Sequence, residues 1–385
     1  MNRRLLLLTF GNFTVGTAMY AFLGVLGALA EDLEVPLARA GQLATGFAVT
    51  FALVAPVLVP ASRRFGAKKV LAASLAAFGV LNLLSAAAPS FRLLFGLRVV
   101  AAAVSCVFGP LAGAVATTMV KPEQRGKALA AVVAGVVLAL AAGVPLGTLV
   151  GGAFGWRATF AFSGVLNLVG AVAIALAIPR TEAPAAGPPS FTFLRRWDAA
   201  SNLVMVMVAF AGVFLAFGYI GPVLERLTGF GARGVGGLQA VVGLGGAVGT
   251  ALGGALADRS PSPRVMAAAF IGGALGFLPF TALFALAAPG STLAIVGCAG
   301  ALLLGSASMF ALVPVLQFRV VRAAGPEAPT ALAFYFSFFY FGQGLGTAAG
   351  GLVVAVAGLA QLGLWAAVVL VLGAGVALRA DAGSR

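Results

Sequence analysis

Long apolar runs, separated by short clusters of charged residues, prolines and glycines, follow one another along the whole chain. A helix needs about 20 apolar residues to cross the hydrocarbon core of a bilayer, and each run is long enough. The pattern therefore predicts twelve membrane-spanning helices joined by short loops. Their approximate ranges are 5–30, 40–60, 70–88, 91–120, a stretch within 135–160, 158–178, 199–224, 234–259, 264–287, 292–318, 329–355 and 359–378.

The composition agrees with this pattern, because 61% of the 385 residues are hydrophobic and only 9% are charged. A soluble domain carries roughly 25% charged residues. The predicted fold class is an all-α membrane protein, and twelve helices with short loops leave no room for a soluble domain.

A repeated sequence indicates that the chain has two similar halves. The pattern Leu-Gly-Thr-x-x-Gly-Gly occurs at 146–152 and again at 345–351. Parallel repeats about an axis along the membrane normal are one recurring transporter architecture. We predict two six-helix bundles, residues 1–178 and 198–385, joined by a linker at 179–197 that holds four prolines.

The net charge of +14 is distributed unevenly, with most of the 24 basic residues in alternate loops. On a soluble domain this charge would indicate a nucleic-acid partner. In a membrane protein, basic loops stay on the cytoplasmic side. We therefore predict a multi-pass protein of the cytoplasmic membrane, with both termini and the linker in the cytoplasm. The expected surroundings are the lipid bilayer, with no nucleic-acid partner, and we expect a monomer.

Residues with catalytic or metal-binding chemistry are scarce. The chain has no histidine, and its two cysteines, Cys106 and Cys298, fall within apolar runs. Neither a disulfide framework nor a metal-ligand spacing is present. The glycine-rich runs lack the Lys-Ser/Thr ending of a phosphate loop. We expect no cofactor, no metal and no enzymatic activity.

The fifth predicted helix contains an unusual row of residues, Gly143, Pro145, Gly147 and Gly151. Proline and glycine are tolerated in a membrane helix because neighbouring helices satisfy the freed backbone groups. Small residues also let two helix backbones approach closely. We predict a bent, closely packed helix whose glycine row, residues 143–152, slides against a helix of the other half.

This segment carries a family resemblance. The sequence Gly-Val-Pro-Leu-Gly-Thr at 143–148, followed by Gly-Trp-Arg-x-Thr-Phe at 155–160, resembles the antiporter motif of the major facilitator superfamily. It is similar to the branch of drug:proton antiporters that includes the arabinose-efflux-like permeases. The resemblance implies two bundles around a central site that opens alternately to each side. It also implies export of a small drug-like or sugar-like molecule, driven by protons if transport is coupled. The alternatives are an uncoupled facilitator and a non-transporting, receptor-like or scaffold member of the fold.

Two basic turns resemble a second motif of the superfamily, its cytoplasmic signature. Arg64 and Gly66 match it after the second helix, where Arg63 occupies the usual acidic position. Asp258 and Arg259 match it after the eighth helix. The resemblance implies that Asp258 latches one conformation near the start of the fifth helix. The alternative is that these charges only set the topology.

Polar residues within the apolar runs are candidates for a substrate cavity. Arg98 is the one basic residue well inside a run, and such a charge normally faces a bundle interior or a water-filled cavity. Helix periodicity also places polar and aromatic residues on shared faces. The cavity candidates are Asn12, Tyr20, Arg98, Asn202, Tyr335, Tyr340 and Gln343. Each of them can instead be a packing residue, and Arg98 can instead extend toward the membrane surface.

Proton coupling has few candidate carriers. The ten acidic residues fall in loops or at helix ends, and Met19 stands where the related antiporters often have glutamate. Either Glu31 or Asp32, at the end of the first helix, faces the cavity and titrates, or the protein is a facilitator without coupling.

Overall fold

The computed structural model describes residues 3–121, 124–179, 192–257, 263–325 and 328–379, which form helices and no strand. Twelve membrane-length spans occur within these residues, as the sequence predicts. The first half contains α1 (Arg3–Tyr20), η1 (Ala21–Val25), α2 (Leu26–Asp32), α3 (Leu37–Ser62), α4 (Ala67–Ala86), α5 (Phe91–Ser105), α6 (Phe108–Thr118), α7 (Arg125–Leu138), η4 (Ala139–Gly143), α8 (Val144–Phe154) and α9 (Trp156–Ala177). The second half contains α10 (Trp197–Phe217), α11 (Ile220–Thr228), α12 (Ala232–Ala257), α13 (Pro263–Leu286), α14 (Thr292–Ala324), α15 (Ala328–Ala357), η7 (Leu359–Gln361) and α16 (Leu362–Arg379).

Three of the twelve spans are interrupted, which the hydrophobic pattern did not show. The first span changes from α1 through the 3₁₀ segment η1 to α2, and the fifth passes through the π-helical segment η4 just before Pro145. The fourth is divided into α5 and α6, whereas the seventh is α10 alone and is followed by the separate short helix α11. Short 3₁₀ and π segments inside longer helices often mark hinges or functional sites.

Local sequence explains several of the helix boundaries. Ser90 accepts a hydrogen bond from the backbone N–H of Leu93 and so caps the first turn of α5. Gly155 connects α8 to α9 with a φ of +86°, a conformation that residues with a Cβ rarely adopt. The chain therefore turns sharply at the beginning of the Gly-Trp-Arg sequence.

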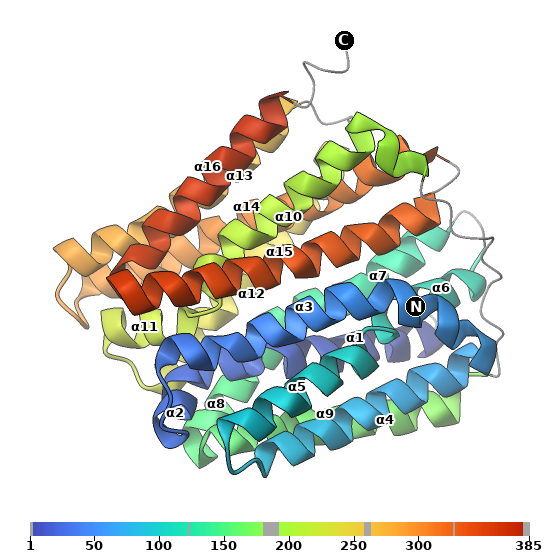
Figure 1. Ribbon diagram of the computed structural model, residues 1–385, viewed down its shortest axis with the longest axis horizontal. Helices are drawn as coiled ribbons and strands as arrows, with labels where there is room; N and C mark the ends of the chain where they lie inside the picture. The colour runs from blue at the N-terminus through green and yellow to red at the C-terminus, as the bar shows by residue number, and fades with distance from the viewer. Residues whose placement is uncertain (1–2, 122–123, 180–191, 258–262, 326–327, 380–385) are drawn as a thin grey trace.

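The spans form two bundles that lie against each other (Figure 1). In the first bundle α4 packs against α9 and α1 against α7, and in the second α14 packs against α12 and α13. The bundles meet mainly where α3 packs against α15 and where α8 and η4 pack against α12. The space between them is therefore bordered by two cross-bundle helix pairs.

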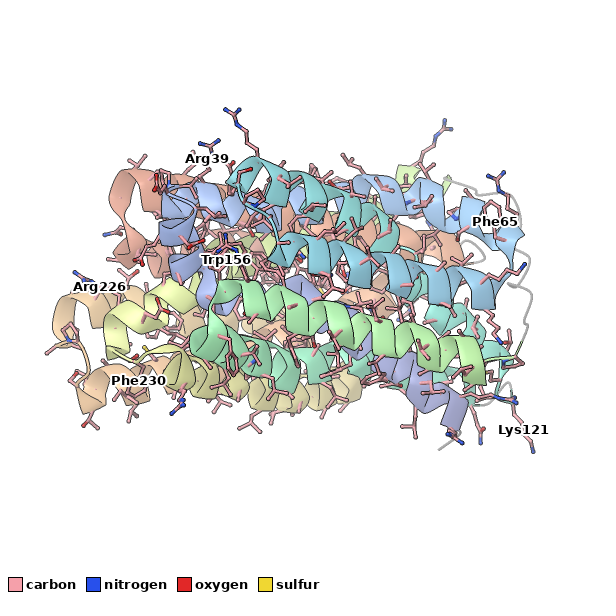
Figure 2. All side chains as sticks on the ribbon, turned by 90° about the horizontal axis from the view of Figure 1, so that it is seen from below. Arg39, Phe65, Lys121, Trp156, Arg226 and Phe230 are labelled. Carbon is pink, nitrogen blue, oxygen red and sulfur yellow. The ribbon has the colours of Figure 1, made fainter. Side chains whose placement is uncertain are left out.

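The long axis of the molecule runs between two ends (Figure 2). Arg39, Arg226 and Phe230 lie at one end, called the Arg226 end, and Phe65 and Lys121 lie at the other, called the Lys121 end (Figure 2). The short helices α2 and α11 lie at the Arg226 end (Figure 1). These two helices and η1 pack against one another across the bundle boundary, so this end is closed.

Candidate functional site between the bundles

Three of the predicted cavity residues come together at the boundary of the two bundles. Tyr20, the last residue of α1, donates a hydrogen bond from its hydroxyl to Oε1 of Gln343 on α15, with the two atoms 3.1 Å apart. Both side chains are buried. The ring of Tyr20 stacks on Phe214 of α10, and Tyr340 lies one turn before Gln343 on α15. The result is a polar contact surrounded by aromatic rings.

A small apolar cavity lies next to this contact. Its volume is about 20 Å³, which is room for roughly one water molecule. Phe214 belongs to both the cavity wall and the Tyr20 contact, and Leu140 of η4 adds a wall residue from the first bundle. The other lining residues are Val213, Phe217, Val242, Phe277, Leu302, Gly305, Ser306 and Met309. A substrate would therefore have to separate the bundles or move side chains to enter.

Arg98 is buried inside the first bundle. Its guanidinium donates hydrogen bonds to the backbone carbonyls of Ala18 and Met19, at 3.1 and 3.2 Å. The rings of Phe22, Phe47 and Phe160 also surround it, with centroids 4.4–5.8 Å from its Cζ. A cation beside the last carbonyls of a helix is favourable, and aromatic faces add to that attraction. Arg98 thus holds the end of α1, where the span changes to η1.

The remaining cavity candidates lie elsewhere. Asn12 donates from Nδ2 to the carbonyl of Val132 and so joins α1 to α7 within one bundle. Tyr335 is fully buried, and no hydrogen-bond partner for its hydroxyl occurs among the described residues. Asn202 accepts a hydrogen bond from Nε of Arg319 at 2.9 Å. It lines a separate cavity of about 320 Å³ with Arg196, Asp198, Phe318, Arg319, Arg322 and Ala323.

Three glycines of the predicted row, one in η4 and two in α8, do not face the other half. A Cβ added at Gly143, Gly147 or Gly151 would lie closer than 3.0 Å to side chains of the first span, at Thr17, Ala21 and Val25 respectively. Small residues at this spacing let the fifth span pack closely against the first, within the same bundle. The expectation of a sliding row was therefore wrong for these three glycines, because the helical stripe that they form points inward.

The cross-bundle contact of α8 is made by the neighbouring stripe instead. Gly152 lies against Ala232 of α12, and the carbonyl of Pro145 lies against Gly236. Between these points, the hydroxyl of Thr148 donates to Oε1 of Gln239 at 2.7 Å. Gln239 stands within an apolar run of the sequence, but a sequence does not reveal which helix lies opposite such a residue.

Tyr219, between α10 and α11, closes the Arg226 end. Its buried hydroxyl lies 3.4 Å from two backbone carbonyls, Ala38 in the first bundle and Thr347 in the second. The ring occupies space above Gly41 and Gly351, where a Cβ would collide with it. Sequence reasoning missed this residue, since a tyrosine at the end of a predicted helix has no distinctive pattern.

The two predicted proton carriers differ in their surroundings. The carboxylate of Asp32 accepts hydrogen bonds from Nε1 of Trp156, at 3.0 Å, and from Nη1 of Arg157, with which it forms an ion pair. Glu31 is exposed and interacts electrostatically with Glu225 of α11.

The basic-turn motif is described only in part. Arg64 is exposed, with its guanidinium 4.8 Å from the ring of Phe65, and Gly66 precedes α4 with a φ of +78°. Asp258 and Arg259 lie outside the described residues. The latch expected for Asp258 stays a prediction.

Comparison with known proteins decides the family. Residues 8–328 match the family described as Major Facilitator Superfamily. The chain belongs to this superfamily. The inner membrane transport protein YdhP of Escherichia coli (strain K12) is 30% identical over 92% of this chain and 89% of its own length. The chloramphenicol resistance protein of Streptomyces lividans is 33% identical over 89% of this chain and 85% of its own length.

Solved structures of superfamily transporters have the same fold. The nucleoside transporter NupG, as its D323A mutant, matches with a TM-score of 0.78 at 12% identity, covering 98% of both chains. A bacterial homologue of the human lysosomal transporter Spinster, in an inward-facing and occupied conformation, matches with a TM-score of 0.75 at 19% identity. It covers 98% of this chain and 96% of that one. The predicted fold class and the family resemblance are therefore confirmed, and the chain is a multi-pass membrane transporter of this superfamily.

Proposed function

We propose that this protein exports a small organic molecule across the cytoplasmic membrane by alternating access. The observation that carries the proposal is the Tyr20–Gln343 hydrogen bond, a buried polar contact between the two bundles beside an apolar cavity. A substrate bound there would replace this contact with bonds of its own to both bundles. Its binding would therefore depend on how far apart the two bundles lie. The likeness to a chloramphenicol resistance protein supports export as the direction of transport.

The composition of the site favours a drug-like substrate over a sugar-like one. The cavity wall has Phe214, Phe217 and Phe277, and its one side-chain hydroxyl, Ser306, is already bonded to the carbonyl of Leu302. A sugar needs many hydrogen-bonding partners, because buried hydroxyls without partners are costly. An aromatic molecule with one or two polar groups needs only Tyr20 and Gln343.

The membrane orientation completes the proposal. The basic bias supports an orientation in which the Lys121 end, both termini and the 179–197 linker are cytoplasmic. The closed Arg226 end then faces outward. In this orientation Tyr219 and the helices around it form the outer gate, and the substrate site lies on the cytoplasmic side of that gate.

Uncoupled, facilitated transport is the second candidate, and one observation favours it. No carboxylate lines the apolar cavity within the described part of the chain. Asp32 is held by Trp156 and Arg157 instead of facing that cavity. Coupling through the membrane core therefore has no evident acidic carrier.

Thermal unfolding of the purified protein with a panel of antibiotics, sugars and amino acids would test the proposal. A ligand that binds the folded state raises the melting temperature. We expect aromatic antibiotics to do so, and sugars not to. A compound that stabilises the protein should also cross the membrane of proteoliposomes. Binding without any flux would support the receptor-like alternative and contradict transport.

A further inference from the structure

The closed Arg226 end brings together two glutamates from different bundles. Glu225 of α11 is half-buried, and a Cβ added at Gly27 of α2 would lie 3.3 Å from its Oε2. Glu31 lies one turn further along α2 and interacts electrostatically with Glu225. Within the described residues, the side chain of Glu225 has no hydrogen-bond or ion-pair partner. A carboxylate is thus packed against the opposite bundle without a cation.

The other elements packed against α11 add few charges near this carboxylate. Asp32 on α2 is already bound to Trp156 and Arg157. Arg226 on α11 itself and Arg233 at the start of α12 are both exposed to solvent. The segments η1 and η7 have no titratable side chain, α13 has none at this end, and Cys298 of α14 is buried.

We propose that Glu225, packed against α2 of the opposite bundle, is a proton-binding site, and that a proton bound there favours closure of the Arg226 end. A half-buried carboxylate with a second negative charge near it is costly to keep ionised. A proton on Glu225 removes that cost. Opening this end would move the Glu225 side chain away from α2 and into water.

The direction of the pH effect follows from the burial of Glu225. In the closed state, burial raises the pKa of Glu225 above its ordinary value, and the charge of Glu31 raises that pKa further. In the open state, with the side chain in water, the pKa of Glu225 would return to its ordinary value. The state with the higher pKa binds the proton more tightly, so lowering the pH stabilises closure. That stabilisation is lost as the pH rises through the raised pKa.

The size of the effect depends on the difference between the two pKa values. Each unit of difference allows the ratio of closed to open molecules to change up to tenfold across the transition. In the proposed orientation an acidic exterior would close the outer gate. This conformational equilibrium needs no substrate, so a failure of the inference would be distinguishable from a failure of the transport proposal.

Distance measurement between spin labels on the two sides of the gate would test the inference. Pro36→Cys and Gly231→Cys place one label on each bundle at exposed positions. Cys106 and Cys298 would both be replaced by alanine, and the protein would be held in lipid nanodiscs between pH 4 and pH 8. We expect the short-distance population to grow as the pH falls.

Three variants separate this site from other acidic groups. Glu225→Gln should hold the short distance at every pH, and Glu31→Gln should move the midpoint to lower pH. Glu34→Gln, an exposed acidic residue in the loop after α2, should leave the profile unchanged. A flat or reversed wild-type profile, or a Glu225→Gln protein with the wild-type profile, would overturn the inference. If Glu225→Gln does not fold, an unchanged midpoint in Glu31→Gln overturns it equally.

Discussion

The hydroxyl of Tyr20 and the side-chain carbonyl of Gln343 join the two bundles through a hydrogen bond of 3.1 Å. Both side chains are buried, so neither can exchange this partner for bulk water while the bundles stay together. The pair is therefore sensitive both to what binds between the bundles and to their separation.

Replacement of Tyr20 by phenylalanine should weaken substrate binding about tenfold. The change removes the hydroxyl to which a bound substrate would hydrogen-bond, and a polar group left buried without a partner in the complex costs about 1–3 kcal/mol. Ligand affinity from thermal-shift titration measures the effect. Tyr335→Phe is the matched control, because the Tyr335 hydroxyl has no partner among the described residues. Equal losses of affinity in the two variants would contradict a special role for Tyr20.

A larger side chain at Gly147 should lower the stability of the folded protein and abolish transport. Gly147→Leu forces a side chain against Ala21 of the first span, and overpacking of this kind costs about 1–3 kcal/mol or more. The melting temperature of the detergent-solubilised protein should fall. Leu146→Val, at a position that is 46% exposed on the outer face of α8, is the control and should be mild. A Gly147→Leu protein with normal stability would rule out close packing at this point.

Leu149 belongs to the contact between α8 and α12. We would expect Leu149→Val to be mild if the side chain faced lipid, but Leu149 lies against Gly236 of α12. The substitution should therefore loosen the cross-bundle contact. Spin labels on α8 and α12 would report a broader distance distribution than in the wild type.

Replacement of Arg98 should lower the free energy of unfolding and leave substrate affinity unchanged. Arg98→Ala leaves a cavity and frees the carbonyls of Ala18 and Met19, so we expect a loss of about 2–5 kcal/mol, the range for truncating a large buried side chain. Arg98→Met fills similar space without a charge and should recover much of that stability. The ligand affinity of the folded Arg98→Met protein distinguishes a role in stability from a role in substrate binding. A large loss of affinity there would assign Arg98 to the substrate site.

The Asp32–Arg157 ion pair should contribute little to stability and nothing to proton coupling. Both side chains are more than 40% exposed, and surface ion pairs contribute little because water and salt screen them. Asp32→Asn should therefore lower the melting temperature only slightly. An imposed pH gradient across liposomes should not drive accumulation of substrate. Strong accumulation that survives the combined Glu31→Gln and Asp32→Asn changes would contradict both coupling through these residues and the facilitator alternative.

The sequence by itself determined the membrane class, the twelve spans and the family. Bilayer thickness sets the length of every apolar run, so span number follows from hydrophobicity alone. The Gly-Val-Pro-Leu-Gly-Thr segment identified the fifth helix because its glycines and proline are unusual in a regular helix. Tyr20, Tyr340 and Gln343 were also found this way, since polar groups within apolar runs are rare.

Only the tertiary structure decided which residues face one another. Helical periodicity assigns a residue to a stripe, but it does not identify the helix opposite that stripe. For this reason the glycine row at Gly143–Gly151 proved to face its own bundle, and Arg98 proved to hold the end of α1. The contacts of Tyr219 with Ala38, and of Glu225 with α2, join segments that are far apart in the sequence. Such contacts exist only once the two bundles have packed together.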